Sequence, residues 1–391
     1  MTEQISPHWR TVTERIELAV KHAVKQAVSP VLESACGQTQ ERFFFESPQS
    51  SALGQALNAL QKQVTFSDKE NAVLPYESDD PLGSAFYTAC RECDKNAEDK
   101  NAQHKNRIIH QYKNRCLFIT TGHCFARCRY CFRRKSSALD YPFASAAEID
   151  ELCTYIKTHS EVREVLLSGG DPLTGTDTQL KALLHALRSS RSDLLIRVCT
   201  RAPVFAPERF TSALISLLKA HKPLWLIPHI NHAAEFSVRF APEAYRALSA
   251  LAENGIPMQS QTVLLRGIND SVDVLADLFH KLTLLGIKPG YLFQGDLAPG
   301  TSHFRVPIDE GLQLYEKLRT ELSGLSLPVY AVDIPDGGGK FNLLRLESGS
   351  TNAVCADIQV QKTEKAYIFT DKRGKIRTYP RETRDIQVHF M

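Results

Sequence analysis

Long hydrophobic runs are missing from this sequence, and so is any large excess of charge of one sign. The 391 residues carry 47 Lys and Arg against 44 Asp and Glu, a formal net charge of +3. Such a balance gives no support to a polyanionic partner such as a nucleic acid. The most apolar stretches, 224–230 and 263–265, are far shorter than the ~20 residues that a membrane-spanning helix needs. We therefore expect no nucleic-acid partner and no membrane partner.

The N-terminus also lacks the apolar core of a secretory signal, since it reads MTEQISPHWR, which predicts a cytoplasmic protein. Disulfides are rare in that reducing compartment. Clusters among the ten cysteines therefore indicate metal binding or catalysis. Five cysteines stand alone and are expected to be small buried hydrophobic residues: Cys36, Cys116, Cys153, Cys199 and Cys355.

The polarity and the spacing of apolar residues divide the sequence into three regions. Residues 1–105 are polar and mainly helical in pattern, with apolar positions at helical spacing between residues 9 and 28. Residues 106–345 alternate short apolar runs with amphipathic segments, which predicts an α/β fold with a full or partial (βα) barrel. Residues 346–391 form a short β-rich tail, in which Asp371-Lys-Arg-Gly374 is the expected turn of a β-hairpin.

The elements of the barrel can be placed by residue range. Expected strands are 116–121, 165–168, 194–200, 224–230, 258–265, 291–294 and 329–332. Expected helices are 146–158, 179–189, 207–220, 242–254 and 272–285. In such barrels active sites lie at the C-terminal ends of the strands. Residues that directly follow a strand are therefore the first candidates for function.

Three closely spaced cysteines follow the first barrel strand: Cys124, Cys128 and Cys131. A loop with this spacing brings three thiolates to one place, and a [4Fe–4S] cluster takes one thiolate at each iron. The loop has no fourth cysteine, so one iron would keep an open position for a small molecule, as open zinc sites do. Neighbouring guanidinium groups would favour the thiolate form: those of Arg127, Arg129, Arg133 and Arg134.

Two other interpretations of the cysteine clusters stay open. The same three cysteines could form a structural zinc loop that borrows His123, although zinc sites usually pair two separate C-x₂₋₄-C knuckles. Cys90 and Cys93 form a second pair in a polar stretch without a partner knuckle. We interpret this pair as incidental, with a zinc or redox site as the alternative.

The order of the motifs resembles the radical S-adenosylmethionine superfamily. The cysteine loop after the first strand is followed, after the second, by the turn Ser168-Gly169-Gly170-Asp171, and in that superfamily such a turn meets the methionine amino group. Two glycines allow close backbone approach, and Asp171 offers an acceptor for an ammonium. The resemblance implies a [4Fe–4S] cluster on the three cysteines. It also implies S-adenosylmethionine bound by Ser168, Gly169, Gly170, Asp171, His229, His232 and Gln261.

Within that superfamily, residues from about 105 to about 345 are similar to the lysine 2,3-aminomutase family. The similarity rests on runs that begin at Tyr112, His229, Gln261, Gly295, His303 and Val332. It implies an isomerase that interconverts L-lysine and β-lysine by migration of the amino group. It also implies pyridoxal phosphate as a further cofactor and a one-electron reductant such as flavodoxin or ferredoxin. A homo-oligomer is compatible with the resemblance.

The resemblance assigns the pyridoxal phosphate site to three residues. Lys340, which ends the run Gly337-Gly-Gly-Lys340, would carry the cofactor on its amine, and glycines leave room for a planar ring beside it. Tyr112 and Arg115 would lie near the ring and its phosphate. Without the family context, a lysine in such a run is usually an exposed turn residue.

The substrate site is assigned in the same way. Arg133 would bind the substrate carboxylate, which a guanidinium can do bidentately. Asp296 and Asp333 would bind the side-chain ammonium of lysine and would disfavour a substrate with a carboxylate there. The alternatives are a surface arginine in a basic run and two solvated loop aspartates.

Some residues depart from the family pattern. Gln111 stands where many members have a second arginine for the phosphate, so Lys113 or loop amides would share that task. Tyr130 and Phe132 resemble a subgroup that modifies a translation factor. The tail contains only Cys355, so no zinc is expected there.

Three alternative functions stay open. The product could serve β-lysylation of a translation elongation factor, although the presence of Lys340 favours turnover of the free amino acid. An aminomutase for another amino acid is the second alternative, which the presence of both Asp296 and Asp333 disfavours. The third is a non-catalytic iron–sulfur protein, which would be expected to bind all four irons through cysteine.

Overall fold

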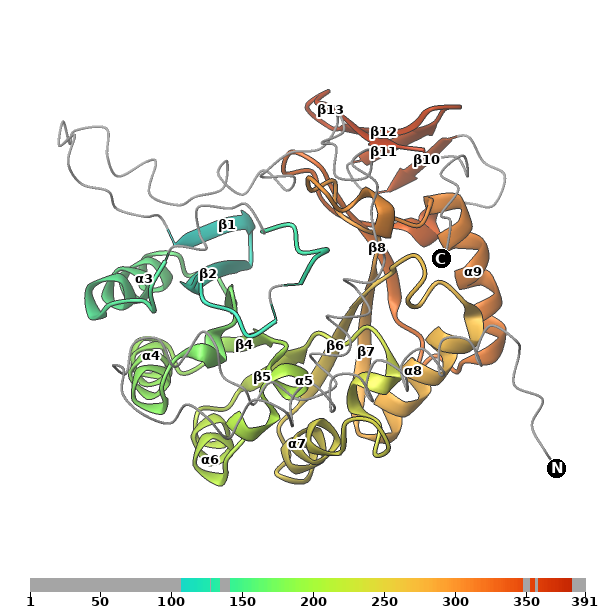
Figure 1. Ribbon diagram of the computed structural model, residues 1–391. Helices are drawn as coiled ribbons and strands as arrows, with labels where there is room; N and C mark the ends of the chain where they lie inside the picture. Colours follow the sequence, from blue (N-terminus) through green and yellow to red (C-terminus); the bar gives the residue numbers. More distant parts are fainter. Residues whose placement is uncertain (1–106, 127, 134–140, 347–351, 356–357, 382–391) are drawn as a thin grey trace, which may run out of the picture.

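A curved nine-stranded sheet forms the centre of the protein. The computed structural model describes residues 107–126, 128–133, 141–346, 352–355 and 358–381 (Figure 1). The expected N-terminal helices lie outside these residues, as do Cys36, Cys90, Cys93, Arg127 and Arg134.

The nine strands follow one another in chain order from one edge of the sheet to the other. Strands β2 to β8 are parallel, whereas β1 and β9 pair antiparallel with their neighbours at the two edges. The bounds are β1 Ile108–Tyr112, β2 Arg115–Thr121, β3 Glu164–Gly169, β4 Leu195–Thr200, β5 Leu224–Pro228, β6 Met258–Val263, β7 Ile287–Phe293, β8 Val329–Ile334 and β9 Gly339–Asn342.

Helices cover the outer face of this sheet, which curves into an open barrel (Figure 1). The long helices are α3 Ala146–Thr158, α4 Asp177–Ser190, α6 Ser212–Ala220, α7 Pro242–Glu253, α8 Val272–Leu284 and α9 Ile308–Glu321. The single turn α5 spans Ala202–Phe205, and short 3₁₀ turns are η4 Pro172–Thr174, η5 Pro207–Arg209, η6 Ala233–Phe236, η7 Ser302–Phe304 and η8 Leu343–Arg345. The alternation of strand and helix confirms the predicted α/β barrel class.

The positions of the helices follow from local sequence. Ser145 and Glu148 form a reciprocal capping box at the start of α3, and Thr176 and Gln179 do the same for α4, which satisfies backbone amides that would otherwise lack partners. The helix expected at 207–220 is divided instead, because the Thr211 side chain accepts from the Leu214 amide and starts α6 after η5.

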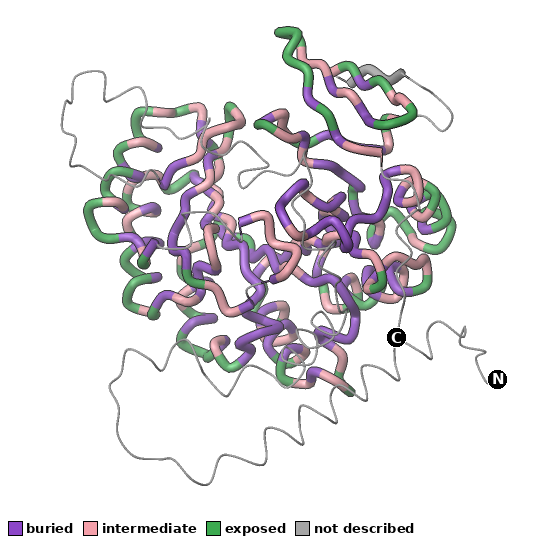
Figure 2. Tube along the Cα trace, turned by 45° about the horizontal axis from the view of Figure 1, so that its top comes forward, coloured by how far each residue is buried: buried purple, intermediate pink, exposed green. Residues whose placement is uncertain are grey.

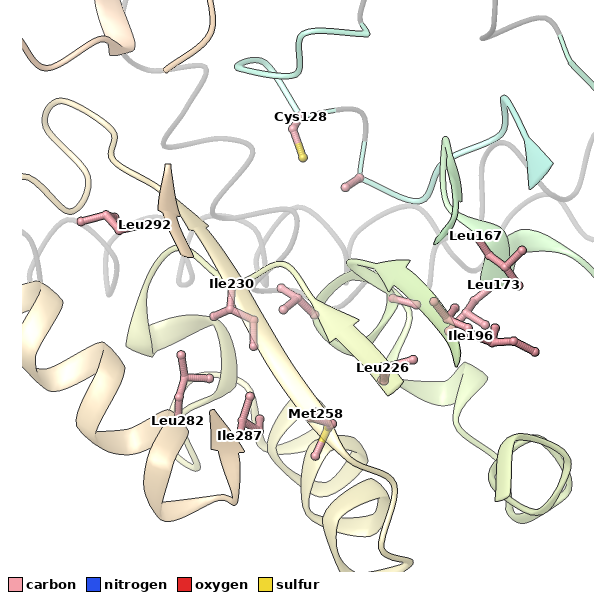
Figure 3. Close-up of a cluster of buried hydrophobic side chains, with 14 of the residues drawn as sticks. Cys128, Leu167, Leu173, Ile196, Leu226, Ile230, Met258, Leu282, Ile287 and Leu292 are labelled. Carbon is pink, nitrogen blue, oxygen red and sulfur yellow. The ribbon is translucent and has the colours of Figure 1, made fainter. Parts of the chain in front are cut away.

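Buried side chains fill the space between the sheet and its helices. Figure 2 shows buried chain concentrated inside and exposed chain along the outer helices. Leu167, Leu226 and Leu292 on three of the strands are 0% exposed, and the close-up in Figure 3 shows them with other apolar side chains of the same cluster. Burying each such side chain contributes roughly 1.5–3 kcal/mol, so the core fixes where the strand ends lie.

The seven predicted barrel strands are confirmed, with shifted ends. Strand β7 begins four residues before the expected start, at Ile287, because Pro289 and Gly290 obscure its apolar pattern. The sequence did not reveal β1, β9 and α9. Strands β1 and β9 are short edge strands of mixed polarity, and pairing with a neighbour defines them more than their own residues do.

A second sheet, antiparallel throughout, follows the barrel in the chain. The predicted hairpin is confirmed as β12 Ala366–Asp371 paired with β13 Ile376–Pro380, and Gly374 in its turn has a φ of 77°. Strands β10 Asn352–Cys355 and β11 Ile358–Lys362 complete it. Figure 1 shows this sheet on the side of β8. Within the described part of the chain, every helix is too short or too polar to traverse a bilayer.

Candidate active site

The sequence-predicted residues gather at the C-terminal ends of the parallel strands. The cysteine loop follows β2, the glycine turn follows β3, His229 follows β5 and Asp296 follows β7. Gln261 lies within β6, Asp333 lies near the end of β8, and Lys340 belongs to β9, which pairs with it. Because parallel strands end on one side of a barrel, these residues share the side where barrel active sites lie.

The backbone of the glycine turn after β3 packs against the start of the cysteine loop and forms hydrogen bonds with it. The Gly170 amide donates to the Thr121 carbonyl at 2.7 Å, and the Asp171 amide donates to the His123 carbonyl at 2.7 Å. A Cβ atom on Gly169 would stand 2.3 Å from the Thr121 carbonyl oxygen, and one on Gly170 would stand 2.1 Å from that of His123. Glycine is therefore required here for the seating of the cysteine loop.

Asp171 connects two strand ends through its carboxylate. Its carboxylate accepts from the Leu173 amide at 3.1 Å, from the Thr200 hydroxyl at 2.8 Å and from the Arg201 amide at 2.8 Å. The residue is only 2% exposed, and burial raises the pKa of its carboxyl although these donors oppose the change. Asp171 therefore joins the turn after β3 to the end of β4, and its assignment to S-adenosylmethionine stays a prediction.

The cysteines lie where the loop meets the barrel interior. Cys128 is 8% exposed, and its side chain points from the loop toward the apolar cluster (Figure 3). The Cys131 amide donates to the Cys128 carbonyl at 3.1 Å, which tightens the second half of the loop. The Cys128 sulfur accepts a hydrogen bond from Nη1 of Arg201 at 2.9 Å, a contact between residues that the sequence separates widely.

The neighbouring Arg133 acts on the Cys131 thiol in the predicted direction, but other effects dominate. Burial raises the pKa of the Cys131 thiol to about 11, the neighbouring Cys128 raises it further, and the opposing charge of Arg133 is too weak to offset them. Arg129 lies with its guanidinium 5.5 Å from the centre of the Phe304 ring. Coordination to a metal would remove the Cys131 proton despite this shift.

The donor set fits an iron–sulfur cluster. Three thiols come from one loop, one of them is held by a guanidinium, and the loop is seated on glycines that leave no room for a side chain. Among the residues that the structure describes, no group of three His, Cys, Asp or Glu side chains is placed to hold a single metal ion. A [4Fe–4S] cluster makes a different demand, because each of its irons takes its own thiolate.

Lys340 and Asp333 form an ion pair at the end of β8. Nζ of Lys340 donates to both carboxylate oxygens of Asp333, at 2.7 and 2.6 Å, and lies 4.5 Å from the centre of the Phe293 ring. Burial acts to lower the pKa of Lys340, but the charge and hydrogen bonds of Asp333, together with the charges of Tyr112 and Asp296, outweigh it and the net pKa is raised. The Lys340 side chain is nevertheless 32% exposed. The predicted cofactor lysine and a predicted substrate carboxylate thus contact each other.

Asp296 completes an electrostatic group with this pair. Burial and the charge of Asp333 raise the pKa of Asp296 to about 7, against the opposing charges of Lys340 and Arg133. Arg133 is 9% exposed and follows the cysteine loop directly. The structure therefore brings two carboxylates, one ammonium and one guanidinium into the same electrostatic environment.

Strand β1 and the first residue of β2 contribute further side chains near Lys340. The Tyr112 hydroxyl accepts from the Lys340 amide at 2.8 Å, and the Arg115 guanidinium stacks 3.8 Å from the centre of the Tyr112 ring. Nε2 of Gln111 donates to the Gly337 carbonyl at 3.2 Å. Gln111, which stands where a second arginine was expected, therefore holds the glycine run, and β1 and β9 are joined across the opening of the barrel.

The two histidines after β5, His229 and His232, differ in the hydrogen bonds of their ring nitrogens. Burial lowers the pKa of both His229 and His232 to about 4, so both are neutral at pH 7. Nδ1 of His232 accepts from the Ala234 amide at 3.0 Å and starts η6. Nε2 of His229 is buried and has no hydrogen-bond partner among the described residues. Gln261 receives the Ile230 amide on its backbone carbonyl at 3.0 Å, which ties β6 to the histidine segment.

Sequence reasoning missed four residues of this region: Arg201, Glu235, Arg305 and Tyr379. Arg201 directly follows a predicted strand, and that position was a usable signal. Tyr379 lies in the tail and gave none. Its hydroxyl donates to the Gly295 carbonyl at 2.5 Å and accepts from Nε2 of Gln294 at 3.0 Å, so the second sheet supports the segment that carries Asp296.

Replacing Tyr379 with phenylalanine tests this support. The change leaves the buried Gly295 carbonyl and the Gln294 amide without their partner, which costs about 1–3 kcal/mol of unfolding free energy. Urea denaturation measures the loss. Thr378→Ala on the exposed face of the same strand is the control and should stay within about 0.5 kcal/mol. Equal effects of the two changes would contradict the role of Tyr379.

Comparison with known proteins gives relatives with related names. A profile of the radical SAM superfamily matches residues 118–279. A putative L-lysine 2,3-aminomutase of Treponema pallidum is 43% identical over 374 residues, which cover 95% of this chain and 94% of the relative. The L-lysine 2,3-aminomutase of Fusobacterium nucleatum is 41% identical over 60% of this chain and 54% of its own length. The glutamate 2,3-aminomutase of Clostridioides difficile is 36% identical over 61% of this chain and 55% of its own length.

Proposed function

Because the chain belongs to the lysine 2,3-aminomutase family of radical S-adenosylmethionine proteins, we propose that it interconverts L-lysine and β-lysine by moving the amino group between Cα and Cβ. The observation that carries this proposal is the group formed by Lys340, Asp333 and Asp296 beyond the cysteine loop. When bound, the cluster and S-adenosylmethionine supply a carbon radical through one-electron cleavage, and pyridoxal phosphate supplies the carrier of the migrating nitrogen. The chain's own residues bind, orient and charge-balance these groups.

Cys124, Cys128 and Cys131 would hold the cluster and leave one iron open to S-adenosylmethionine. The buried Nε2 of His229 supports a role in binding that ligand, because a buried polar atom is costly without a partner. Ser168, Gly169, Gly170 and Gln261 border the same side of the barrel. His232 and Asp171 would act through the backbone segments that they hold.

Lys340 is suited to carry pyridoxal phosphate. Its side chain is 32% exposed, and its backbone amide donates to the Tyr112 hydroxyl. Gly339 has a φ of 84°, a conformation that favours glycine, and this places the lysine at the start of β9. Arg115, stacked on Tyr112, offers the guanidinium for the phosphate.

Asp333 would serve two cations in turn. In the structure it balances the ammonium of Lys340. With the amine engaged by the cofactor, Asp333 and Asp296 would lose the charge of the Lys340 ammonium, and the guanidinium groups of Arg133 and Arg305 would be the remaining cations acting on Asp296. The side-chain ammonium of lysine then restores the balance, while Arg133 binds the carboxylate end of the substrate. A glutamate side chain would instead bring a third negative charge to these two, which is unfavourable at close range.

The remaining partners belong to the same proposal. A one-electron donor of the flavodoxin or ferredoxin class would reduce the cluster, and the barrel core of residues 106–345 would carry the chemistry between its extensions. The relatives are named for free amino acids, which does not favour the translation-factor alternative. Three cysteines in the loop, where an electron carrier would be expected to bind all four irons through cysteine, disfavour a non-catalytic role.

The test is an assay under oxygen-free conditions. Protein reconstituted with iron, sulfide and pyridoxal phosphate is given dithionite, S-adenosylmethionine and L-lysine, and β-lysine is measured. L-Glutamate in place of L-lysine is the matched control and should give no product. Appearance of 5′-deoxyadenosine without β-lysine would support cleavage of S-adenosylmethionine but contradict the proposal that L-lysine is the substrate. Protein that binds zinc and no iron would overturn the whole proposal.

Asp296 predicts the pH dependence of this activity. Its pKa of about 7 means that the carboxyl becomes protonated as the pH falls through 7 and then ceases to attract an ammonium. Apparent kcat/KM for lysine should therefore fall roughly tenfold per pH unit below that point, as for loss of one required ionisation. The positive charge of Lys340 lowers the pKa of Asp296. If pyridoxal phosphate neutralises Lys340, the pKa of Asp296 rises, and the acid limb of the pH profile moves to higher pH. An Asp296→Asn variant that keeps the same acid limb would contradict the assignment.

A further inference from the structure

Arg201 makes a contact that the proposed function does not explain. The residue directly follows β4 and is 6% exposed. Its Nη1 donates to the Cys128 sulfur at 2.9 Å, its Nη2 donates to Oε1 of Glu235 at 2.9 Å, and its Nε donates to the His229 carbonyl at 3.2 Å. Each guanidinium nitrogen thus has a buried acceptor, and one acceptor is a proposed cluster ligand.

The surroundings hold this guanidinium in place. The Arg201 amide donates to the buried Asp171 carboxylate, and the Phe205 ring lies 4.5 Å from the guanidinium carbon. Glu235 is 2% exposed and accepts from the Asn231 amide at 3.1 Å through its other oxygen. A buried positive charge with one carboxylate partner is costly to maintain for stability alone. Its place beside Cys128 therefore calls for a different explanation.

We propose that Arg201 is a positioning residue that sets the reduction potential of the cluster through its hydrogen bond to the Cys128 sulfur, with Glu235 limiting the effect as its counter-ion. The inference rests on the proposed function, because it requires a cluster on the three cysteines. Reduction adds one electron from the external donor and makes the cluster more negative. A charged donor at a ligand sulfur stabilises that state more than the oxidised one, and burial strengthens the interaction.

The proposal predicts shifts of opposite sign in the two partners. Arg201→Met removes the donor and the positive charge, so the equilibrium constant for reduction should fall about tenfold, which equals about 59 mV toward negative potential for one electron. Glu235→Gln removes the counter-charge and should shift the potential the other way. Arg201→Lys keeps the charge and should lie between Arg201→Met and the unchanged protein.

The measurement is an oxygen-free potentiometric series on the reconstituted protein, followed by electron paramagnetic resonance of the reduced cluster. Iron and sulfide content are determined for every variant. Arg197→Met is the matched control, because Arg197 lies on β4 and pairs with Glu164 at 3.2 Å, away from the cysteine loop. Its potential should equal that of the unchanged protein.

Several outcomes would overturn the proposal. Arg201→Met and Glu235→Gln could leave the potential unchanged or shift it in the same direction, which a structural bridge between strands would produce. Loss of the cluster from both Arg201 variants, with Arg197→Met retaining it, would place Arg201 in cluster assembly instead. If the unchanged protein holds no cluster, the proposed function itself fails. That result differs from a normal cluster whose reduction potential is the same in the Arg201 variants, which contradicts only the role of Arg201.

Discussion

Replacing Lys340 with alanine should abolish covalent attachment of pyridoxal phosphate and lower β-lysine formation by on the order of 10³-fold or more, the size of effect seen when a reacting group is removed. The lysine amine lies within reach of a ligand because its side chain is 32% exposed. Its backbone is fixed by Tyr112, so few other amines can take its place. Its contacts among the described residues, Tyr112, Asp333 and Phe293, lie outside the cysteine loop, and cluster content should therefore be unchanged.

Borohydride trapping checks this prediction without relying on activity. Pyridoxal phosphate is added, the adduct is reduced, and the labelled peptide is identified by mass. The control is Lys362→Ala, since Lys362 also pairs with an aspartate, at 2.6 Å from Asp309, but lies in the second sheet. Labelling should persist in Lys362→Ala and vanish in Lys340→Ala. Labelling of Lys340→Ala to the same extent would remove Lys340 from the proposed site.

Asp333→Asn should cause the second large loss, about 10²–10³-fold in kcat/KM for L-lysine. Removing one partner of a desolvated charge pair costs roughly 2–5 kcal/mol, much of it the penalty of leaving the other charge unpaired, and each 1.4 kcal/mol is tenfold. The loss should be confined to substrates with a side-chain ammonium. Norleucine, which lacks that group, should show little difference between the variant and the unchanged protein.

The same substitution should also change Lys340. Burial lowers the pKa of that lysine, and the charge and hydrogen bonds of Asp333 are the main effects that raise it, so Asp333→Asn should lower it. Attachment of pyridoxal phosphate, which needs the neutral amine, should then extend to lower pH. Asp193→Asn, an exposed aspartate that pairs with Arg191, is the control and should change neither property. An unaltered pH profile of attachment in Asp333→Asn would contradict the role of Asp333 as counter-ion.

Much of the fold could be predicted because local sequence patterns, such as capping residues and apolar runs, indicate where helices and strands form. The capping residues Ser145 and Thr176 fix helix starts within a few positions of the sequence, and apolar runs mark the parallel strands. Edge strand β9 escaped detection because pairing with β8, rather than its own residues, defines it. Helix α9 escaped because its first turn carries Asp309, Glu310 and Gly311, which read as loop residues.

The sequence by itself determined which candidate site residues lie close together within one local segment. The spacing of Cys124, Cys128 and Cys131, the glycines at 169 and 170, and the lysine that ends a glycine run are local features, and the covalent chain alone holds their members near one another. Their roles as ligands stay predictions, but their proximity does not depend on the rest of the fold.

Only the tertiary structure decided which distant groups meet. Arg201 reaches Cys128 across 73 positions, and Tyr112 reaches Lys340 across 228; the curvature of the sheet sets both distances. The same curvature brings the Asp171 carboxylate to the Thr200 hydroxyl and the Arg201 amide. Side-chain charge is visible in a sequence, but its partner is chosen by packing, because burial makes each unpaired polar group costly.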